Sequence, residues 1–404
     1  MMTSKQKYSI LFILGGLSAL APFSIDMYLP AFPSIAKSLQ TDISHVALSL
    51  TSYFIGISIG QLFYGPITDK FGRKKPLIFG LSLFLIASIG CALSPSIDFL
   101  IAMRVILALG GCVGMVVSRA VVRDLFPVSE IPKIFSILML IVGVAPILAP
   151  TIGGWVLAHS TWRSIFYFLT AFSFILIICV ALFLPESKNP NRAKSLKAKD
   201  VIRDYADVLQ EKTFLYYAFG SSIAMAGMFA YISGSPFVFM DFFKFSEQEY
   251  SWVFGGNALG FILGSQLNRI FLNKFSPLQV ITGSSVLLMA LSFLIFGLFL
   301  ANVLSPFLLI IILFFYLFSL GLLVPNCTAL ALAPFTYNAG SASALIGFIQ
   351  MLTGASISGL VSVLHNGTIF PMVFGMFFCG SICFLIIMIL NSKIKKWKLE
   401  TNPA

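Results

Sequence analysis

Charged side chains are scarce in this chain. Only 10% of its 404 residues are Asp, Glu, Lys or Arg, and 58% are hydrophobic, whereas about 25% of the residues of a soluble domain are charged. The long apolar runs also lack the alternation of polar and apolar residues that is typical of membrane strands. The composition therefore excludes a soluble domain, and the patterning argues against a membrane barrel.

Histidine and cysteine are also few, which disfavours two kinds of site. The three histidines lie near the ends of apolar runs, so we expect no nucleophile–base pair inside the spans, and an intramembrane enzyme is disfavoured. Cys379 and Cys383 share a helix face, but no His or carboxylate accompanies them, so we expect no metal site. We expect all six cysteines to be small buried hydrophobic side chains: Cys91, Cys112, Cys179, Cys327, Cys379 and Cys383.

The apolar runs have the length of membrane-spanning helices. A span needs about 20 mostly apolar residues. We therefore predict an all-α, polytopic membrane protein with twelve transmembrane helices in two pseudo-symmetric six-helix bundles. The first run follows Lys5 and Lys7 as in a signal peptide, but it is long enough to span, and we expect it to be retained. The predicted spans are 8–30, 46–66, 77–95, 98–118, 133–157, 164–184, 213–239, 249–271, 278–299, 303–327, 340–364 and 368–391.

The basic residues gather at alternate ends of these runs. The net charge is +11, but its distribution indicates membrane topology, and we expect no nucleic-acid partner. Of the 26 Lys and Arg residues, all lie on one side of the twelve-helix arrangement except Lys37, Arg104, Arg163 and Lys244. The positive-inside rule then places both termini in the cytoplasm.

A hydrophilic connection near the middle divides the chain. We predict an N-terminal six-helix bundle at 1–186, a cytoplasmic linker at 187–212 and a C-terminal six-helix bundle at 213–404. Apolar residues recur on one side of 196–209, which favours a short amphipathic helix on the cytoplasmic surface, although a solvated linker is also open. Two bundles around a midplane site form a known transporter architecture.

Two charges lie well inside predicted spans, Asp26 and Arg104. A lone charge at the bilayer centre costs about 2.5–3.5 kcal/mol on insertion scales, so each should face a water-filled cavity or a partner. Asp26 could exchange a proton and so make proton and cargo alternatives at one site, with Arg104 adjusting its affinity. A fixed Asp26–Arg104 ion pair, or Asp26 at the membrane surface beside Pro30, are the structural alternatives.

The segment GPITDKFGRKK, residues 65–75, reads as a short basic hairpin between the second and third spans. Gly65 and Gly72 would permit a tight turn or a close approach of helices. Asp69 and Arg73 could join Asp124 in a charge cluster that holds the cytoplasmic side closed. The alternative is ordinary positive charge that fixes topology.

The fifth span contains APILAPTIGGW, residues 145–155. Pro146 and Pro150 remove backbone hydrogen bonds and should kink the helix. Gly153 and Gly154 would let it lie flat against a neighbour, as a hinge or an interface helix would. A kink with no further role is the alternative.

The second half has polar groups in its spans but no charge, and aromatic residues are dense, with 42 Phe in the chain. Such side chains could line a cavity for an amphipathic cargo, although most Phe should face lipid or pack between helices. The candidate cavity residues are Tyr28, Tyr231, Phe237, Asn257, Asn326 and Gln350.

These motifs resemble those of the major facilitator superfamily and, within it, the Bcr/CflA group of bicyclomycin-resistance-like drug/proton antiporters. Residues 65–75, Arg104 with its following glycines, and residues 145–155 are similar to motifs of the superfamily and its antiporters. Residues 24–33 and 226–239 resemble the group more specifically, and residues 256–269 and 325–335 also resemble it. Leu107 and Ser18 depart from related patterns, which often have Gln and a second acid there.

The resemblance implies proton-coupled efflux of small amphipathic molecules or drugs across the bacterial inner membrane by alternating access. The expected partners are a small-molecule substrate, protons and the lipid bilayer. No cofactor is expected, because the proton gradient drives transport, and we expect a monomer. The alternative is a proton-coupled uptake symporter, or an exporter of a specific metabolite or siderophore.

Overall fold

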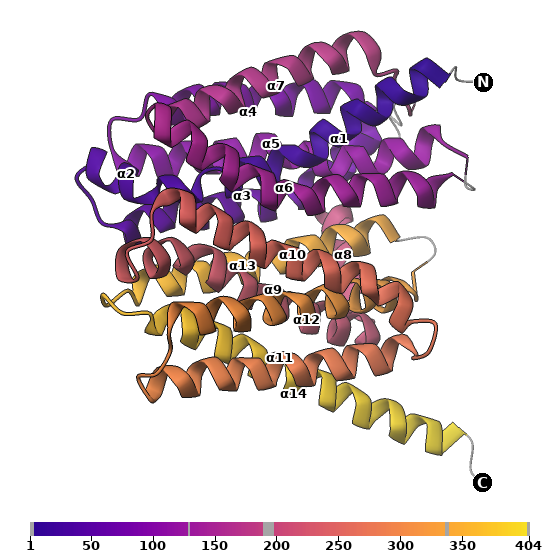
Figure 1. The fold of residues 1–404 in the computed structure, drawn as a ribbon. Helices are drawn as coiled ribbons and strands as arrows, with labels where there is room; N and C mark the ends of the chain where they lie inside the picture. Colours follow the sequence, from indigo (N-terminus) through magenta and orange to yellow (C-terminus); the bar gives the residue numbers. More distant parts are fainter. Residues whose placement is uncertain (1–3, 128–129, 189–197, 336–338, 402–404) are drawn as a thin grey trace. The chain divides into compact units, whose positions relative to one another are not determined.

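The chain is helical throughout the part that the structure describes. The structure is a computed structural model that describes residues 4–127, 130–188, 198–335 and 339–401, and within these ranges it contains helices and no strand (Figure 1). In the described residues, 11 helices are long and apolar enough to cross a membrane. A further long helix, α10 (Glu247–Phe271), carries Asn257, Gln266 and Asn268, which make it less apolar.

Contacts between residues divide the chain into two compact units. Unit 1 comprises Met1–Asp204 together with Lys244–Gly255, and unit 2 comprises Tyr205–Phe243 together with Gly256–Ala404. The start of α10 therefore belongs to unit 1 and the rest of that helix to unit 2. The predicted domain boundaries at 186 and 212 stay a prediction.

Unit 1 contains the first seven α-helices of the chain and one 3₁₀ turn. They are α1 (Ser4–Asp26), η1 (Leu29–Ala31), α2 (Phe32–Ser38), α3 (Ile43–Phe71), α4 (Lys74–Ala92), α5 (Ile97–Leu125), α6 (Ile131–His159) and α7 (Arg163–Phe183).

Unit 2 contains five further long helices and a short π-helical segment. They are α9 (Lys212–Pro236), η2 (Phe237–Phe242), α11 (Pro277–Leu300), α12 (Pro306–Leu332), α13 (Ala339–Val363) and α14 (Phe370–Thr401).

The two units repeat one pattern of helix neighbours. In unit 1, α1 packs against α5, α6 and α7, while α4 packs against α5 and α7. In unit 2, α9 packs against α12, α13 and α14, while α11 packs against α12 and α14. The neighbours of α1 and α4 in unit 1 thus correspond to those of α9 and α11 in unit 2, as expected of two pseudo-symmetric bundles. The predicted fold class is confirmed.

Several helices begin at signals that the sequence carries. Ser276 and Ser305 precede α11 and α12, and their hydroxyls accept hydrogen bonds from the backbone N–H of Gln279 and Leu308 at 3.3 Å each. A proline follows each serine at the first helical position, where its missing N–H costs nothing. These caps fix where each helix enters its unit.

The first predicted span is broken rather than continuous. Helix α1 ends at Asp26, a turn follows, and η1 and α2 continue the chain to Ser38. Pro30 and Pro33 lie in the first turns of η1 and α2. Proline lacks the N–H that a helix interior needs, so it can begin a helical segment but not continue one. The predicted span over 8–30 therefore corresponds to the candidate membrane span Gln6–Ser38, within which the helix is interrupted after Asp26.

The linker contains a helix, α8 (Ala198–Leu209). Of the two interpretations of this segment, an amphipathic helix and a solvated linker, the first predicted a helix here. Val208 is fully buried, whereas Ile202 is 64% exposed. The apolar residues of α8 are thus divided between the protein and the surface. Leu196, which we also expected on the apolar side, lies outside the described residues.

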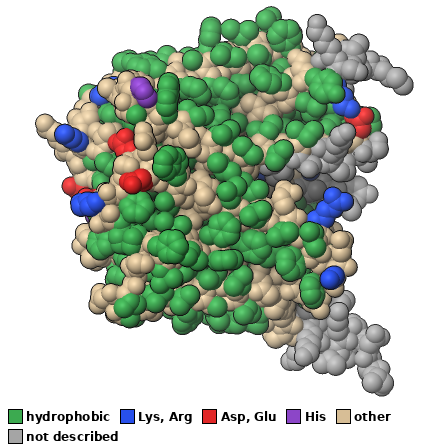
Figure 2. Space-filling view, viewed as in Figure 1, with side chains coloured by type: hydrophobic (Ala, Val, Ile, Leu, Met, Phe, Trp, Pro, Cys, Tyr) green, Lys and Arg blue, Asp and Glu red, His purple; other side chains and the backbone are tan. Residues whose placement is uncertain are grey.

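Hydrophobic side chains dominate the surface as well as the core. Figure 2 shows them over most of the visible face, with the few charged side chains toward its left and right edges. Large apolar side chains that are more than half exposed include Phe12, Phe79, Trp155, Leu182 and Phe307. A surface of this kind suits lipid rather than water.

Candidate functional site

Asp26 and Arg104 both lie buried in unit 1. Asp26 is the last residue of α1 and is 5% exposed, and Arg104, in α5, is fully buried. The break that follows α1 therefore places a carboxyl group where the regular helix stops. Burial inside the protein does not fix the depth of Asp26 in the membrane, so the alternative that places it at the membrane surface beside Pro30 stays a prediction.

Arg104 is held by α1 and by two aromatic rings. Its Nη1 donates hydrogen bonds to the backbone oxygen of Ser24 at 2.9 Å and to the Ser24 hydroxyl at 3.0 Å. The guanidinium carbon lies 4.6 Å from the ring centre of Tyr28 and 4.2 Å from that of Tyr53. Each ring face attracts a cation. These contacts hold the guanidinium group beside the end of α1 without a carboxylate.

Asp26 and Arg104 form no ion pair, although both are described. The Nε and Nη2 atoms of Arg104 are buried and have no hydrogen-bond partner in the described chain. Unpaired buried donors on a charged group are costly, by about 1–3 kcal/mol or more. The fixed ion pair that we kept as an alternative is therefore not present, and Arg104 retains donor capacity that could be used in another state.

The predicted charge cluster is assembled around Arg73. Its Nη1 donates to Asp69 Oδ1 at 2.9 Å and to the Thr68 hydroxyl at 3.0 Å, and its Nε donates to Asp124 Oδ2 at 2.9 Å. Lys188 Nζ also lies 2.9 Å from Asp69 Oδ1. The structure thus brings together the end of α3, the end of α5 and the segment after α7.

Glu186 is part of this cluster and was not anticipated. Its carboxylate accepts hydrogen bonds from the backbone N–H groups of Arg73 at 2.7 Å and Lys74 at 3.2 Å. These groups lie at the N-terminus of α4, where the helix dipole favours a negative charge. The only signal in the sequence was an acid directly after the sixth apolar run, among basic residues. Its partners are more than a hundred positions away.

The two loop glycines differ in their surroundings. Gly72 has a φ of 84°, which L-residues rarely adopt, and a Cβ added there would lie only 2.8 Å from Glu186 Oε2. Gly65 lies within α3, and no atom of the described chain comes within 4 Å of a Cβ added there. The expectation of a turn or close approach thus fits Gly72 and does not fit Gly65.

Replacing Arg73 with alanine should destabilise unit 1. The side chain of Arg73 is 8% exposed, and its removal leaves Asp69 and Asp124 close together without their shared cation. We expect a loss of about 2 kcal/mol, or at least about 4 °C in the melting temperature of the purified protein. Arg73→Lys should recover only part of the lost stability, because the ammonium group of lysine cannot donate to three acceptors from the planar arrangement that a guanidinium group provides.

The matched control for Arg73→Ala is Lys75→Ala, which removes an exposed positive charge from the same loop. Its melting temperature should equal that of the wild type. Equal effects of the two substitutions would mean that the charges of the loop matter only for topology.

The glycine pair of the fifth span marks two close contacts of α6. A Cβ on Gly153 would meet the backbone carbonyl oxygen of Met27, next to the break in the first span, and a Cβ on Gly154 would lie 2.9 Å from Ser251 Oγ. Pro150 is buried and Pro146 is partly exposed, both inside the helix. Gly153 thus permits α6 to lie against the backbone that follows Asp26.

The cavity candidates fall into separate local groups. Tyr28 hydrogen-bonds with the Ser49 hydroxyl at 2.8 Å in unit 1. In unit 2, Asn257 Nδ2 donates to the Tyr231 hydroxyl at 3.2 Å, while the Asn257 Oδ1 is buried without a partner in the described chain.

The remaining candidates also lie in unit 2. Asn326 Nδ2 donates to Asn268 Oδ1 at 2.7 Å, across the contact between α10 and α12. The ring of Phe237 packs edge-on against His365, with 4.2 Å between ring centres. Gln350 is partly exposed on α13. Asn326 is thus held by a helix–helix contact, whereas the Oδ1 atom of Asn257 is buried without a partner in the described chain.

No group of three or more His, Cys, Asp or Glu side chains suited to a metal ion occurs in the described part of the chain. Five of the six cysteines are buried and Cys179 is partly exposed.

Comparison with known proteins identifies the family. The family model described as Major Facilitator Superfamily matches residues 14–359. The chain is 37% identical to "Uncharacterized MFS-type transporter YdgK" of Bacillus subtilis over 92% of each protein. It is 29% identical to "Bicyclomycin resistance protein homolog" of Haemophilus influenzae over 96% of this chain and 98% of that protein. It is 28% identical to "Multidrug resistance protein MdtL" of Escherichia coli over 91% and 92%.

Solved structures agree in fold. A D-xylose-proton symporter superposes with a TM-score of 0.74 at 16% identity, covering 94% of this chain and 97% of that one. A bacterial homologue of the lysosomal transporter Spinster gives 0.68 at 13% identity and covers 96% of each chain. The named relatives are consistent with the Bcr/CflA group. The chain therefore belongs to the Major Facilitator Superfamily, whose members are membrane transporters rather than enzymes.

Proposed function

We propose that this transporter exports small amphipathic molecules, drugs among them, across the bacterial inner membrane in exchange for protons. Transport proceeds by alternating access between the two units, needs no cofactor beyond the proton gradient, and is performed by a monomer with both termini in the cytoplasm. The charge cluster around Arg73 acts as the cytoplasmic gate. The named relatives that carry bicyclomycin or multidrug resistance in their names support an amphipathic cargo.

The observation that carries the proposal is the buried carboxyl group of Asp26, which has no ion-pair partner. An ionised carboxylate in a membrane interior is costly unless water or a cation reaches it. A carboxyl group in this position can hold a proton in one state of the cycle and release it in another. Arg104 lies nearby with two unused donors and can favour the ionised form when the site rearranges.

Everted membrane vesicles with an acidic interior test the proposal directly. Bicyclomycin, chloramphenicol, a sulfonamide and cysteine are added one at a time, and a pH-sensitive dye follows the gradient. We expect at least one compound to dissipate the gradient in vesicles that contain the protein and not in vesicles without it. The same compound, radiolabelled, should accumulate inside only while the interior is acidic.

Two results would contradict the proposed export of drugs in exchange for protons. A compound that leaves everted vesicles together with protons would identify an uptake symporter, the alternative that the sequence left open. A gradient that no amphipathic drug disturbs, but that a single metabolite or siderophore dissipates, would replace drug export by export of that metabolite. A melting curve of the purified protein verifies that it is folded in each case.

A further inference from the structure

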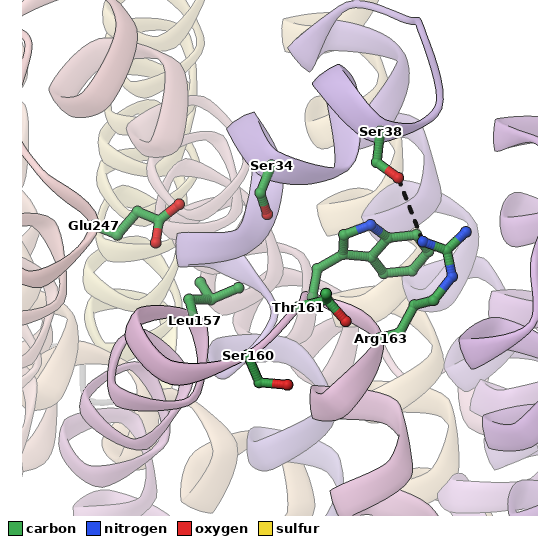
Figure 3. Close-up of a pocket in the computed structure, with 8 residues that line it drawn as sticks. Ser34, Ser38, Leu157, Ser160, Thr161, Arg163 and Glu247 are labelled. Carbon is green, nitrogen blue, oxygen red and sulfur yellow. Dashed lines mark hydrogen bonds between the residues drawn. The ribbon is translucent and has the colours of Figure 1, made fainter.

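A cavity of about 310 Å³ lies at the end of unit 1 where α6 turns into α7. This end is remote from the Arg73 cluster, which meets the opposite end of α7. Figure 3 shows the labelled side chains arranged around the cavity, from α2, the α6–α7 turn and the first turn of α10. All of them belong to unit 1, because that unit includes Lys244–Gly255. The lining residues are Ser34, Ser38, Leu157, Ser160, Thr161, Trp162, Arg163 and Glu247.

Trp162, which lines the cavity, contains a buried hydrogen-bond donor without an acceptor in the described chain. Trp162 is 3% exposed, and its indole Nε1–H has no partner in the described chain. Leaving a buried donor unsatisfied costs about 1–3 kcal/mol. An oxygen atom of a bound molecule would remove this cost.

Arg163 supplies a fixed positive charge beside that donor. Its Nη1 donates to Ser38 Oγ at 3.3 Å and its Nη2 to the backbone oxygen of Ser94 at 3.1 Å. The guanidinium carbon lies 4.3 Å from the ring centre of Trp162. Since a guanidinium group has five N–H donors, Arg163 keeps donors for a ligand after it has made these two bonds.

Glu247 supplies a negative charge to the same cavity. It forms no ion pair within the described residues, and partial burial raises its pKa above the ordinary value of 4.5. A carboxylate that loses water without gaining a cation is stabilised by a positively charged ligand. Its carboxyl group is drawn apart from Arg163 in Figure 3, with Ser34 and Leu157 between them.

The size and charges of the cavity limit what could bind. A volume of about 310 Å³ corresponds to about ten water molecules at about 30 Å³ each. We propose that this cavity binds a small zwitterion of amino-acid or dipeptide size. The carboxylate of the ligand accepts from Trp162 and Arg163, its ammonium group faces Glu247, and the hydroxyl groups of the cavity bind its polar middle. This inference does not depend on the direction of transport or on the cargo.

Titration calorimetry on the purified full-length protein tests the inference with three probes of one backbone. Glycylglycine is zwitterionic, N-acetylglycylglycine has only the carboxylate, and glycylglycinamide has only the ammonium group. We expect glycylglycine to bind at least about tenfold more tightly than either capped form, because each capped form leaves one cavity charge unpaired.

Four variants at three positions assign the contacts. Glu247→Gln should weaken glycylglycine binding about tenfold and leave the acetylated probe unchanged. Trp162→Phe, which removes the N–H at similar shape, should weaken both carboxylate probes and spare the amide. Arg163→Lys should weaken carboxylate probes less than Arg163→Gln does.

Matched controls are Asp98→Asn and Lys37→Gln, which remove exposed charges outside the cavity. Both should bind glycylglycine as the wild type does. Equal binding of the three probes, no change in Glu247→Gln, or no heat from any probe at millimolar concentrations would each overturn the proposal. Since the assay measures no transport, its failure is separate from failure of the proposed export.

Discussion

Vesicles that contain the Asp26→Asn variant should release no protons when substrate is added, like vesicles without the protein. Asparagine has nearly the shape of aspartate but cannot carry a proton at this position. Since Asp26 is 5% exposed and has no ion-pair partner, the substitution removes a titratable group without breaking a salt bridge. The variant should therefore keep its fold and lose only the coupling of proton release to substrate transport.

Two further variants make this prediction specific. Asp42→Asn removes an acid that is exposed just before α3 and should transport normally. Asp26→Glu keeps a titratable group and should keep part of the activity. Normal proton release by Asp26→Asn, in protein with an unchanged melting temperature, would remove Asp26 from the coupling pathway.

Replacing Gly153 with alanine should reduce transport by about tenfold to a hundredfold. The added methyl group would press against the backbone oxygen of Met27. A backbone atom next to the helix break cannot move aside as a flexible side chain can, so α6 or the segment after Asp26 must shift. Overpacking of this kind costs about 1–3 kcal/mol, and each 1.36 kcal/mol added to a barrier slows a step tenfold.

The neighbouring glycine provides an internal comparison. Alanine at Gly154 would meet Ser251 Oγ at 2.9 Å, a side-chain atom, so Ser251→Ala should restore transport to Gly154→Ala. Met27→Ala should not restore Gly153→Ala, because the obstructing atom belongs to the backbone. Gly283→Ala in α11, where no atom lies within 4 Å of the new Cβ, is the neutral control. Equal transport by Gly153→Ala and Gly283→Ala would show that the contact with Met27 is unimportant.

The spans could be predicted from the sequence because lipid demands long apolar segments. The first predicted span, 8–30, contains Pro30, whose local effect on helix continuation explains why the helix is interrupted after Asp26. Charges inside spans are rare and costly, which is why Asp26 and Arg104 stood out.

Contacts between distant segments could not be predicted in the same way. Nothing near Glu186 in the sequence indicates that it caps the N-terminus of α4, since that pairing depends on how α4 packs against α7. Likewise, Arg104 binds the backbone and hydroxyl of Ser24, although Asp26 was the partner that charge alone suggested. At Gly65 the sequence predicted a close contact that the described part of the chain does not contain. A glycine within a recognised motif is not necessarily required by the packing around it.

The assignment of Lys244–Gly255 to unit 1 has a consequence for biosynthesis. A ribosome that has delivered all of α1 to α7 has not yet supplied every residue of that unit, because α9 must emerge before Glu247 and Ser251 become available. The end of α6 and its turn into α7 therefore lack their neighbours Glu247 and Ser251 until part of unit 2 has been inserted. Nascent chains arrested before and after residue 255 should differ in the protection of this turn from proteases.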